Sequence, residues 1–150
     1  MYDVRELYQE LIIDHSKKPR NFYALTDSDR SAQGYNPLCG DKVTVYLKLE
    51  GDRVQEASFQ GSGCAISTAS ASLMTETLKG KTRAEVEALF QRFHTLVTKD
   101  NPETPAVSEL GKLAVFSGVR DYPVRVKCAT LAWHTLRAAL QGGGETVSTE

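Results

Sequence analysis

The residues of this sequence most able to do chemistry are three cysteines, Cys39, Cys64 and Cys128. Each is expected at the boundary of a helix or strand, where a thiol can face an opening. Cys39 lies in an Asn-Pro-Leu-Cys-Gly-Asp turn, Cys64 opens a helix after Gly-Ser-Gly, and Cys128 falls in the first turns of the last helix. An odd number of cysteines, in a chain that begins without a signal peptide, argues against a disulfide framework.

The surroundings of these thiols favour the thiolate, the form that binds metals and attacks sulfur. A helix N-terminus stabilises a thiolate, which applies to Cys64 and more weakly to Cys128. Arg125 and Lys127 add positive charge beside Cys128. The pattern therefore indicates either a reactive thiol or a set of metal ligands.

Asp41 adds a fourth donor of the right kind. Gly40 permits a tight turn that can aim Cys39 and Asp41 at one point. Three thiolates and a carboxylate suit tetrahedral zinc, and Arg125 and Lys127 would offset part of the excess negative charge. However, the spacing contains no C-x-x-C and matches no zinc ribbon or finger. The residues alone leave open both a shared site and three unrelated thiols.

The elements that must position these residues follow from hydrophobic periodicity and from capping signals. Helices are predicted over residues 3–15, from Cys64 to Gly80, from a T-x-x-E capping box at Thr82 to residue 97, around 107–114, and after Pro123. Residues 43–49 and 53–59 alternate as the two strands of a hairpin, with a phase slip between Val54 and Ala57. Residues 16–36 are interpreted as a long connection.

This pattern predicts one α+β domain over residues 1–150, with a small antiparallel sheet of about three strands and helices packed on it. Residues 144–150 are expected to form a flexible tail. The helical histidines His94 and His134 are interpreted as surface or packing residues rather than ligands, and the single Trp133 is interpreted as a packing residue. A solvated helix end is one explanation of His15, Pro19 and Arg20.

Composition excludes several classes of function. The chain has 150 residues, 41% of them hydrophobic and 25% charged, with 18 Lys and Arg against 19 Asp and Glu. A net charge of −1 indicates no basic surface that would attract nucleic acid, and no stretch of residues is long and apolar enough to cross a membrane. We therefore expect a cytoplasmic protein with neither nucleic-acid nor membrane partners.

Several stretches together resemble the SufU/IscU family of iron–sulfur cluster assembly proteins (NifU N-terminal-like), and specifically its SufU branch. The matching stretches are residues 7–15, Pro19-Arg20-Asn21, Asn36-Pro37-Leu38-Cys39-Gly40-Asp41, Phe59-Gln60-Gly61-Ser62-Gly63-Cys64-Ala65-Ile66-Ser67 and Arg125-Val126-Lys127-Cys128-Ala129-Thr130-Leu131-Ala132-Trp133. In the scaffold branch a histidine precedes the third cysteine, whereas here Lys127 does. The segment between Cys64 and Cys128 is also longer than in that branch. Both departures resemble SufU.

The resemblance implies a small sheet with helices on it and with the cysteines at one end. It implies a zinc site formed by Cys39, Asp41, Cys64 and Cys128. It further implies a zinc-dependent sulfurtransferase that takes persulfide sulfur from a SufS-type cysteine desulfurase onto Cys39. In this scheme, docking of the desulfurase exchanges a zinc ligand and so frees the Cys39 thiolate. Downstream iron–sulfur assembly proteins would be further partners.

Two alternatives stay open beside the sulfurtransferase. The first is a non-enzymatic scaffold on which an iron–sulfur cluster is assembled and passed on, because soft thiolates take zinc and iron–sulfur clusters alike. Lys127, which cannot replace a neutral imidazole as a ligand, argues against this alternative. The second is a structural zinc protein that only docks partners, which a closed four-ligand site would fit.

Overall fold

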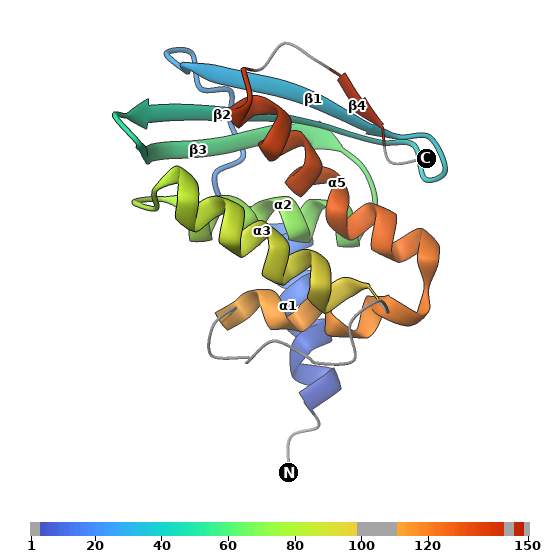
Figure 1. Ribbon diagram of the computed structural model, residues 1–150. Coiled ribbons are helices and arrows are strands. Elements are labelled where there is room, and N and C mark those ends of the chain that lie inside the picture. The colour runs from blue at the N-terminus through green and yellow to red at the C-terminus, as the bar shows by residue number, and fades with distance from the viewer. Residues whose placement is uncertain (1–3, 99–110, 143–145, 149–150) are drawn as a thin grey trace.

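A computed structural model describes residues 4–98, 111–142 and 146–148. Its elements follow in the order α1 (Val4–Lys17), β1 (Arg30–Asn36), β2 (Asp41–Glu50), β3 (Arg53–Ser62), α2 (Ala65–Leu78), α3 (Arg83–Val97), the 3-10 helix η1 (Gly111–Asp121), α5 (Pro123–Leu140) and β4 (Thr146–Ser148). Figure 1 shows the sheet on one side of the molecule and the helices on the other. The predicted α+β class is confirmed.

The sheet has the strand order β3-β2-β1-β4. Strands β1, β2 and β3 are antiparallel neighbours, as predicted for a sheet of about three strands. Strand β4 adds a short parallel edge beside β1. The sequence predicted a flexible tail here, and the structure instead pairs Thr146–Ser148 with β1, whereas residues 144, 145, 149 and 150 lie outside the described residues.

The prediction that residues 16–36 are only a connection is wrong, because Arg30–Asn36 form β1. The inward positions of this strand are Ala32, Gly34 and Asn36, which are small or polar although all are buried. The strand therefore lacks the apolar alternation that marks a half-buried strand. Those positions are interior because α5 packs across this face of β1.

The predicted hairpin and its phase slip are both confirmed. Inward-facing Val43, Val45 and Leu47 of β2 are buried. The pairing shifts register after Lys48, since Lys48 pairs with Glu56 while Leu49 pairs with Val54. This irregularity is a β-bulge, which adds one residue to β3 and so changes the alternation.

The helices cover the inner face of the sheet in two layers (Figure 1). Helices α2 and α5 contact the sheet, while α1, α3 and η1 pack on the far side of α2 and α5. Trp133 is fully buried and stacks on Phe93 of α3, with ring centroids 4.6 Å apart, so its predicted packing role is confirmed. His94 and His134 likewise lie partly buried against Phe90.

Helix α5 approaches the sheet closely because β1 carries a glycine at the crossing. An added Cβ on Gly34 would overlap Oγ1 of Thr135 and lie 3.1 Å from Cδ1 of Leu131. This approach brings the N-terminal part of α5, with Cys128, to the β1–β2 turn.

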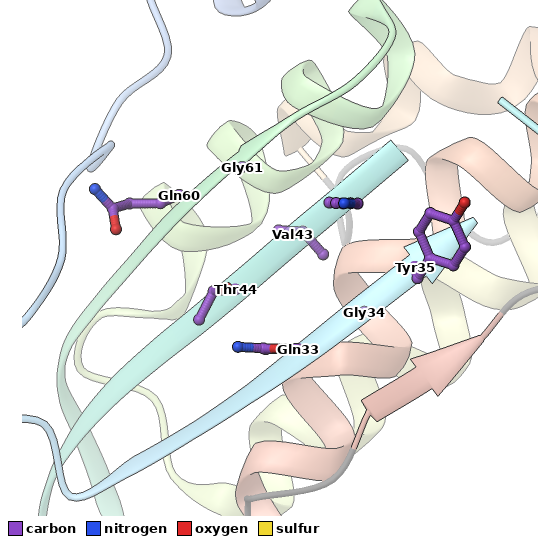
Figure 2. A pocket seen from close by; sticks show the side chains of 8 residues that line it. Gln33, Gly34, Tyr35, Val43, Thr44, Gln60 and Gly61 are labelled. Atoms are coloured by element: carbon purple, nitrogen blue, oxygen red, sulfur yellow. The ribbon is translucent and has the colours of Figure 1, made fainter. Parts of the chain in front are cut away.

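The opposite face of the sheet faces away from the helices and is polar. Figure 2 shows Gln33, Tyr35, Thr44 and Gln60 around an open pocket on β1, β2 and β3. None of the three cysteines lines this pocket. The candidate chemistry therefore lies elsewhere in the fold.

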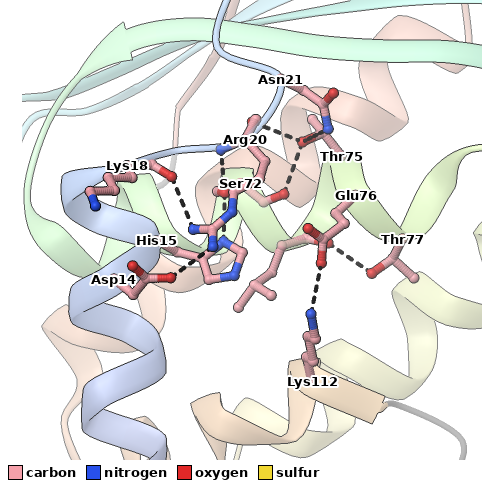
Figure 3. Close-up of polar contacts among 11 residues, drawn as sticks. Asp14, His15, Lys18, Arg20, Asn21, Ser72, Thr75, Glu76, Thr77 and Lys112 are labelled. Atoms are coloured by element: carbon pink, nitrogen blue, oxygen red, sulfur yellow. Dashed lines mark hydrogen bonds and ion pairs between the residues drawn. The ribbon is translucent and has the colours of Figure 1, made fainter.

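A polar network joins α1 to α2, the helix that Cys64 caps (Figure 3). His15 is 1% exposed, and its Nδ1 lies 2.7 Å from Oγ of Ser72. The backbone N–H of Arg20 donates to the same oxygen at 2.8 Å, and the Arg20 guanidinium pairs with Asp14. The interpretation of His15 as part of a solvated helix end is therefore wrong, because the following chain folds back over it onto α2.

Two further observations complete the fold. The short helix predicted around residues 107–114 appears as η1 from Gly111, and residues 107–110 lie outside the described residues. Among the helices in the described part of the chain, none is long and apolar enough to cross a bilayer.

Candidate metal centre

The turn between β1 and β2 carries Cys39 and delivers Asp41. Asn36 and Asp41 pair at the end of the two strands, and Gly40 adopts a φ of 70°, which permits the tight reversal. Cys39 is exposed at this turn, whereas Asp41 is fully buried at the first position of β2. The turn thus supplies one accessible thiol and one buried carboxylate.

Cys64 enters the same region as the N-cap of α2. Its sulfur accepts the backbone N–H of Ser67 at 3.4 Å, so the prediction that Cys64 opens a helix is confirmed. Its own N–H donates to Oδ1 of Asp41 at 2.8 Å, and its Sγ lies 3.7 Å from Oδ2 of Asp41. The buried carboxylate therefore holds the start of α2 against the start of β2.

Cys128 closes the site from α5. Its side chain is 2% exposed, and its Sγ lies 3.2 Å from Sγ of Cys39. Burial raises the pKa of the Cys128 thiol, and contacts with Cys39, Asp41 and Cys64 raise it further. All three neighbours accept hydrogen bonds or carry negative charge, so the free thiolate is costly here unless a cation compensates it.

The donor set fits a zinc ion. The ligand atoms of Cys39, Asp41 and Cys128 all lie within 4.8 Å of one another, and Cys64 joins them through its 3.7 Å contact with Asp41. With Zn–S bonds of about 2.3 Å and tetrahedral angles, sulfurs around one zinc are roughly 3.8 Å apart. The structure thus groups Cys39, Asp41 and Cys128, with the sulfurs of Cys39 and Cys128 3.2 Å apart. It places Cys64 beside Asp41 but outside that group of three, so Cys64 as a fourth ligand stays a prediction.

Arg125 and Lys127, the two cations predicted beside the site, make no polar contact with the candidate ligands in the described part of the chain. Arg125 is exposed, and its guanidinium lies over the ring of Tyr122 at 4.5 Å. Lys127 is half-buried on α5. Within the described residues, neither side chain makes a hydrogen bond or ion pair with the cysteines or Asp41. A charge effect of these residues on the thiols stays a prediction.

Sequence reasoning missed two residues that shape the site. Asn36 is fully buried and contacts both Asp41 and Cys128. Gly63 leaves room for the carboxylate, because an added Cβ would lie 2.5 Å from Oδ1 of Asp41. An asparagine that precedes proline in a turn, three residues before a cysteine, was the available signal for Asn36. No signal in the sequence pointed to Gly63.

Comparison with known proteins agrees with this fold. The family described as the NifU-like N terminal domain matches residues 7–129. The chain belongs to this family, which includes the SufU and IscU proteins of iron–sulfur cluster assembly.

Individual relatives carry two different functional names. The chain is 40% identical to the zinc-dependent sulfurtransferase SufU of Bacillus subtilis over 140 residues, which are 92% of this chain and 93% of that protein. It is 39% identical to the iron-sulfur cluster assembly scaffold protein IscU of Streptococcus pyogenes serotype M1 over 138 residues, which are 92% of this chain and 85% of that protein.

A solved structure places the fold in the same family. The crystal structure of FiSufU from Fervidobacterium islandicum AW-1 superposes with a TM-score of 0.82 at 34% identity, covering 92% of this chain and 99% of that one. The predicted resemblance to the SufU/IscU family is therefore confirmed, with support for the SufU branch. Iron–sulfur cluster assembly is the general process of this family.

Proposed function

We propose that this protein is a zinc-dependent sulfur acceptor, which receives persulfide sulfur from a cysteine desulfurase on Cys39. The observation that carries the proposal is the contrast among three convergent thiols. Cys39 is exposed, whereas Cys64 is half-buried at a helix cap and Cys128 is buried. A sulfur that must meet a partner's persulfide needs access as well as thiolate character.

Hydrogen bonding supports the same choice of sulfur. Cys64 Sγ accepts the N–H of Ser67, and Cys128 Sγ accepts from the Asn36 amide. Within the described residues, no N–H donor reaches Cys39 Sγ. N–H hydrogen bonds draw charge from a thiolate, and the sulfur of Cys39, whose contact within these residues is with the thiol of Cys128, is spared them. Zinc held by Cys39, Asp41, Cys64 and Cys128 would keep the thiols deprotonated at neutral pH.

The transfer is a thiol–disulfide exchange that balances without an external oxidant. The Cys39 thiolate attacks the terminal sulfur of the desulfurase persulfide and supplies the electron pair of the new S–S bond. The old S–S bond breaks, and its electron pair leaves with the desulfurase cysteine as a thiolate. The proton on the terminal sulfur travels with it, and the product is a Cys39 persulfide.

A desulfurase assay tests this proposal. Alanine production from cysteine by a SufS-type desulfurase, under reductant, is measured with the zinc-loaded protein, the zinc-stripped protein and the Cys39→Ala variant. We expect stimulation by the zinc-loaded parent alone. In a parallel reaction without reductant, which would remove the outer sulfur, we expect a gain of one sulfur atom on the Cys39 peptide by mass spectrometry. Equal stimulation by Cys39→Ala would refute the relay.

The alternative is a scaffold for an iron–sulfur cluster, the role named for the Streptococcus pyogenes relative. The same three thiols and carboxylate could serve it, because soft ligands bind iron–sulfur clusters as well as zinc. Lys127 in front of Cys128 weighs against it, since an ammonium cannot replace imidazole as a ligand. Absence of desulfurase stimulation, with binding of iron and labile sulfide, would establish the scaffold instead.

A further inference from the structure

Asn36 is a buried side chain in contact with the metal centre that the ligand set does not include. It occupies the last position of β1 and is fully buried. Its Nδ2 lies 3.4 Å from Oδ2 of Asp41 and 3.5 Å from Sγ of Cys128. Its Oδ1 accepts the backbone N–H of Leu38 at 3.2 Å.

These contacts use both donors of the amide and one of the two acceptor sites on its oxygen. A carboxamide has two N–H donors and one carbonyl acceptor. The acceptor closes an Asx turn onto Leu38, next to Cys39 in the chain. Both donors go to atoms of the candidate ligands, one on β2 and one on α5. A buried amide without these partners would be costly, so the three contacts support one another.

One side chain thus joins the three segments that must meet around the metal. The β1–β2 turn and the start of β2 are neighbours in the sequence, but Cys128 in the second turn of α5 lies 92 residues after Asn36. The Asn36 amide touches all three and is itself held by the β1–β2 pairing. Partners of metal ligands commonly fix ligand orientation in this way, and their loss typically lowers metal affinity about 10–100-fold.

We propose that Asn36 is the positioning residue of the metal centre, which orients Asp41 and Cys128 toward the ion through its two amide N–H groups and holds the Cys39 turn through its carbonyl. This inference rests on the proposed zinc site. It assigns to Asn36 no contact with the transferred sulfur.

Zinc binding by the full chain tests this inference. The affinity is measured by competition with a chromophoric chelator for the parent, Asn36→Ala and Asn36→Leu. Leucine keeps nearly the volume of asparagine without a donor or acceptor, so Asn36→Leu remains informative if the cavity in Asn36→Ala prevents folding. The matched control is Gln33→Ala, which removes an exposed amide from the same strand. We expect a loss of about 10–100-fold in both Asn36 variants and none in the control.

The absorption spectrum of the cobalt-loaded protein is a second measurement. It would not change if Asn36 only stabilised the fold. Loss of the N–H donor to Cys128 raises the energy of the sulfur lone pair. The thiolate-to-cobalt charge-transfer band should therefore move to longer wavelength in both Asn36 variants.

Two outcomes would be negative, and they are distinguishable. Zinc affinity within about threefold of the parent, together with the parent's cobalt spectrum, would overturn the role of Asn36 even if the melting temperature fell. A parent protein that binds neither zinc nor cobalt would overturn the proposed function itself.

Discussion

Gly63→Ala is a sharp test of where Asp41 lies, because the added methyl group has no free space. An ideal Cβ at this position would lie 2.5 Å from Oδ1, 3.0 Å from Cγ and 3.1 Å from Cβ of Asp41. Asp41 is fully buried, and Oδ1 accepts the N–H of Cys64 at 2.8 Å. The carboxylate cannot move into solvent, so it must shift within the site.

The expected cost follows from this overlap. Overpacking of a well-packed interior costs about 1–3 kcal/mol in the free energy of unfolding. For a chain of this size, a loss of about 2 kcal/mol lowers the melting temperature by roughly 4–8 °C. A displaced carboxylate ligand should also lower zinc affinity by about 10–100-fold, by analogy with disturbed ligand orientation.

Thermal unfolding of the zinc-free protein and chelator competition of the zinc-loaded protein measure the two effects separately. Gly118→Ala is the matched control, because an added Cβ there meets no atom within 4 Å. It should leave both quantities nearly unchanged. If Gly63→Ala keeps the parent's melting temperature and zinc affinity, the placement of Asp41 against Gly63 is refuted.

Three further predictions concern a histidine, a serine and the thiol pair. Burial holds the pKa of His15 in the folded protein below its usual 6.5. At a pH between the folded and unfolded pKa values, the unfolded chain therefore binds more protons than the folded protein. Stability should therefore be complete above about pH 7 and fall as the pH drops through 6.5, measured by urea unfolding at several pH values. His15→Gln should reduce this slope without abolishing it, because burial also lowers the pKa of His134. An unchanged slope would contradict the assignment to His15. Ser58→Ala should leave the free energy of unfolding unchanged or raise it, because Oγ of Ser58 is buried without a hydrogen-bond partner. A loss above about 1 kcal/mol would reveal a contact that this structure lacks. Diamide should join Cys39 to Cys128 in the zinc-free protein, since their sulfurs lie 3.2 Å apart, and bound zinc should slow the reaction. Peptide mapping checks the pairing, and a predominant bond from either residue to Cys64 would contradict the geometry.

The elements with strong local signals could be predicted from the sequence. The capping box of Thr82 and Glu85 is present at the start of α3, and Cys64 caps α2. The hairpin and its phase slip follow from side-chain alternation, which each strand displays by itself. Strand β1 could not be predicted, because Ala32, Gly34 and Asn36 are neither bulky nor uniformly apolar. Their burial depends on α5, whose sequence begins more than 80 residues later.

The candidate site likewise has features that the sequence predicts and features that it does not. The types of donor and their positions at turns and helix starts can be read from the sequence, which supports a metal or thiol chemistry. Spacing alone left open whether the three cysteines meet. Local sequence offered only an asparagine before proline in a turn as a signal for Asn36, and none for Gly63, since their roles consist of contacts with residues on other elements.

The sequence by itself thus determined the local structure and the chemical character of this protein: its helix caps, its hairpin, three thiols and a carboxylate. Only the tertiary structure decided which thiol is exposed and which is buried, and which amide faces the ligands. The physical reason is that capping and alternation depend on neighbours along the chain. Burial, sulfur–sulfur distances and the pKa of Cys128 depend on the packing of α5 and α2 against the β1–β2 turn.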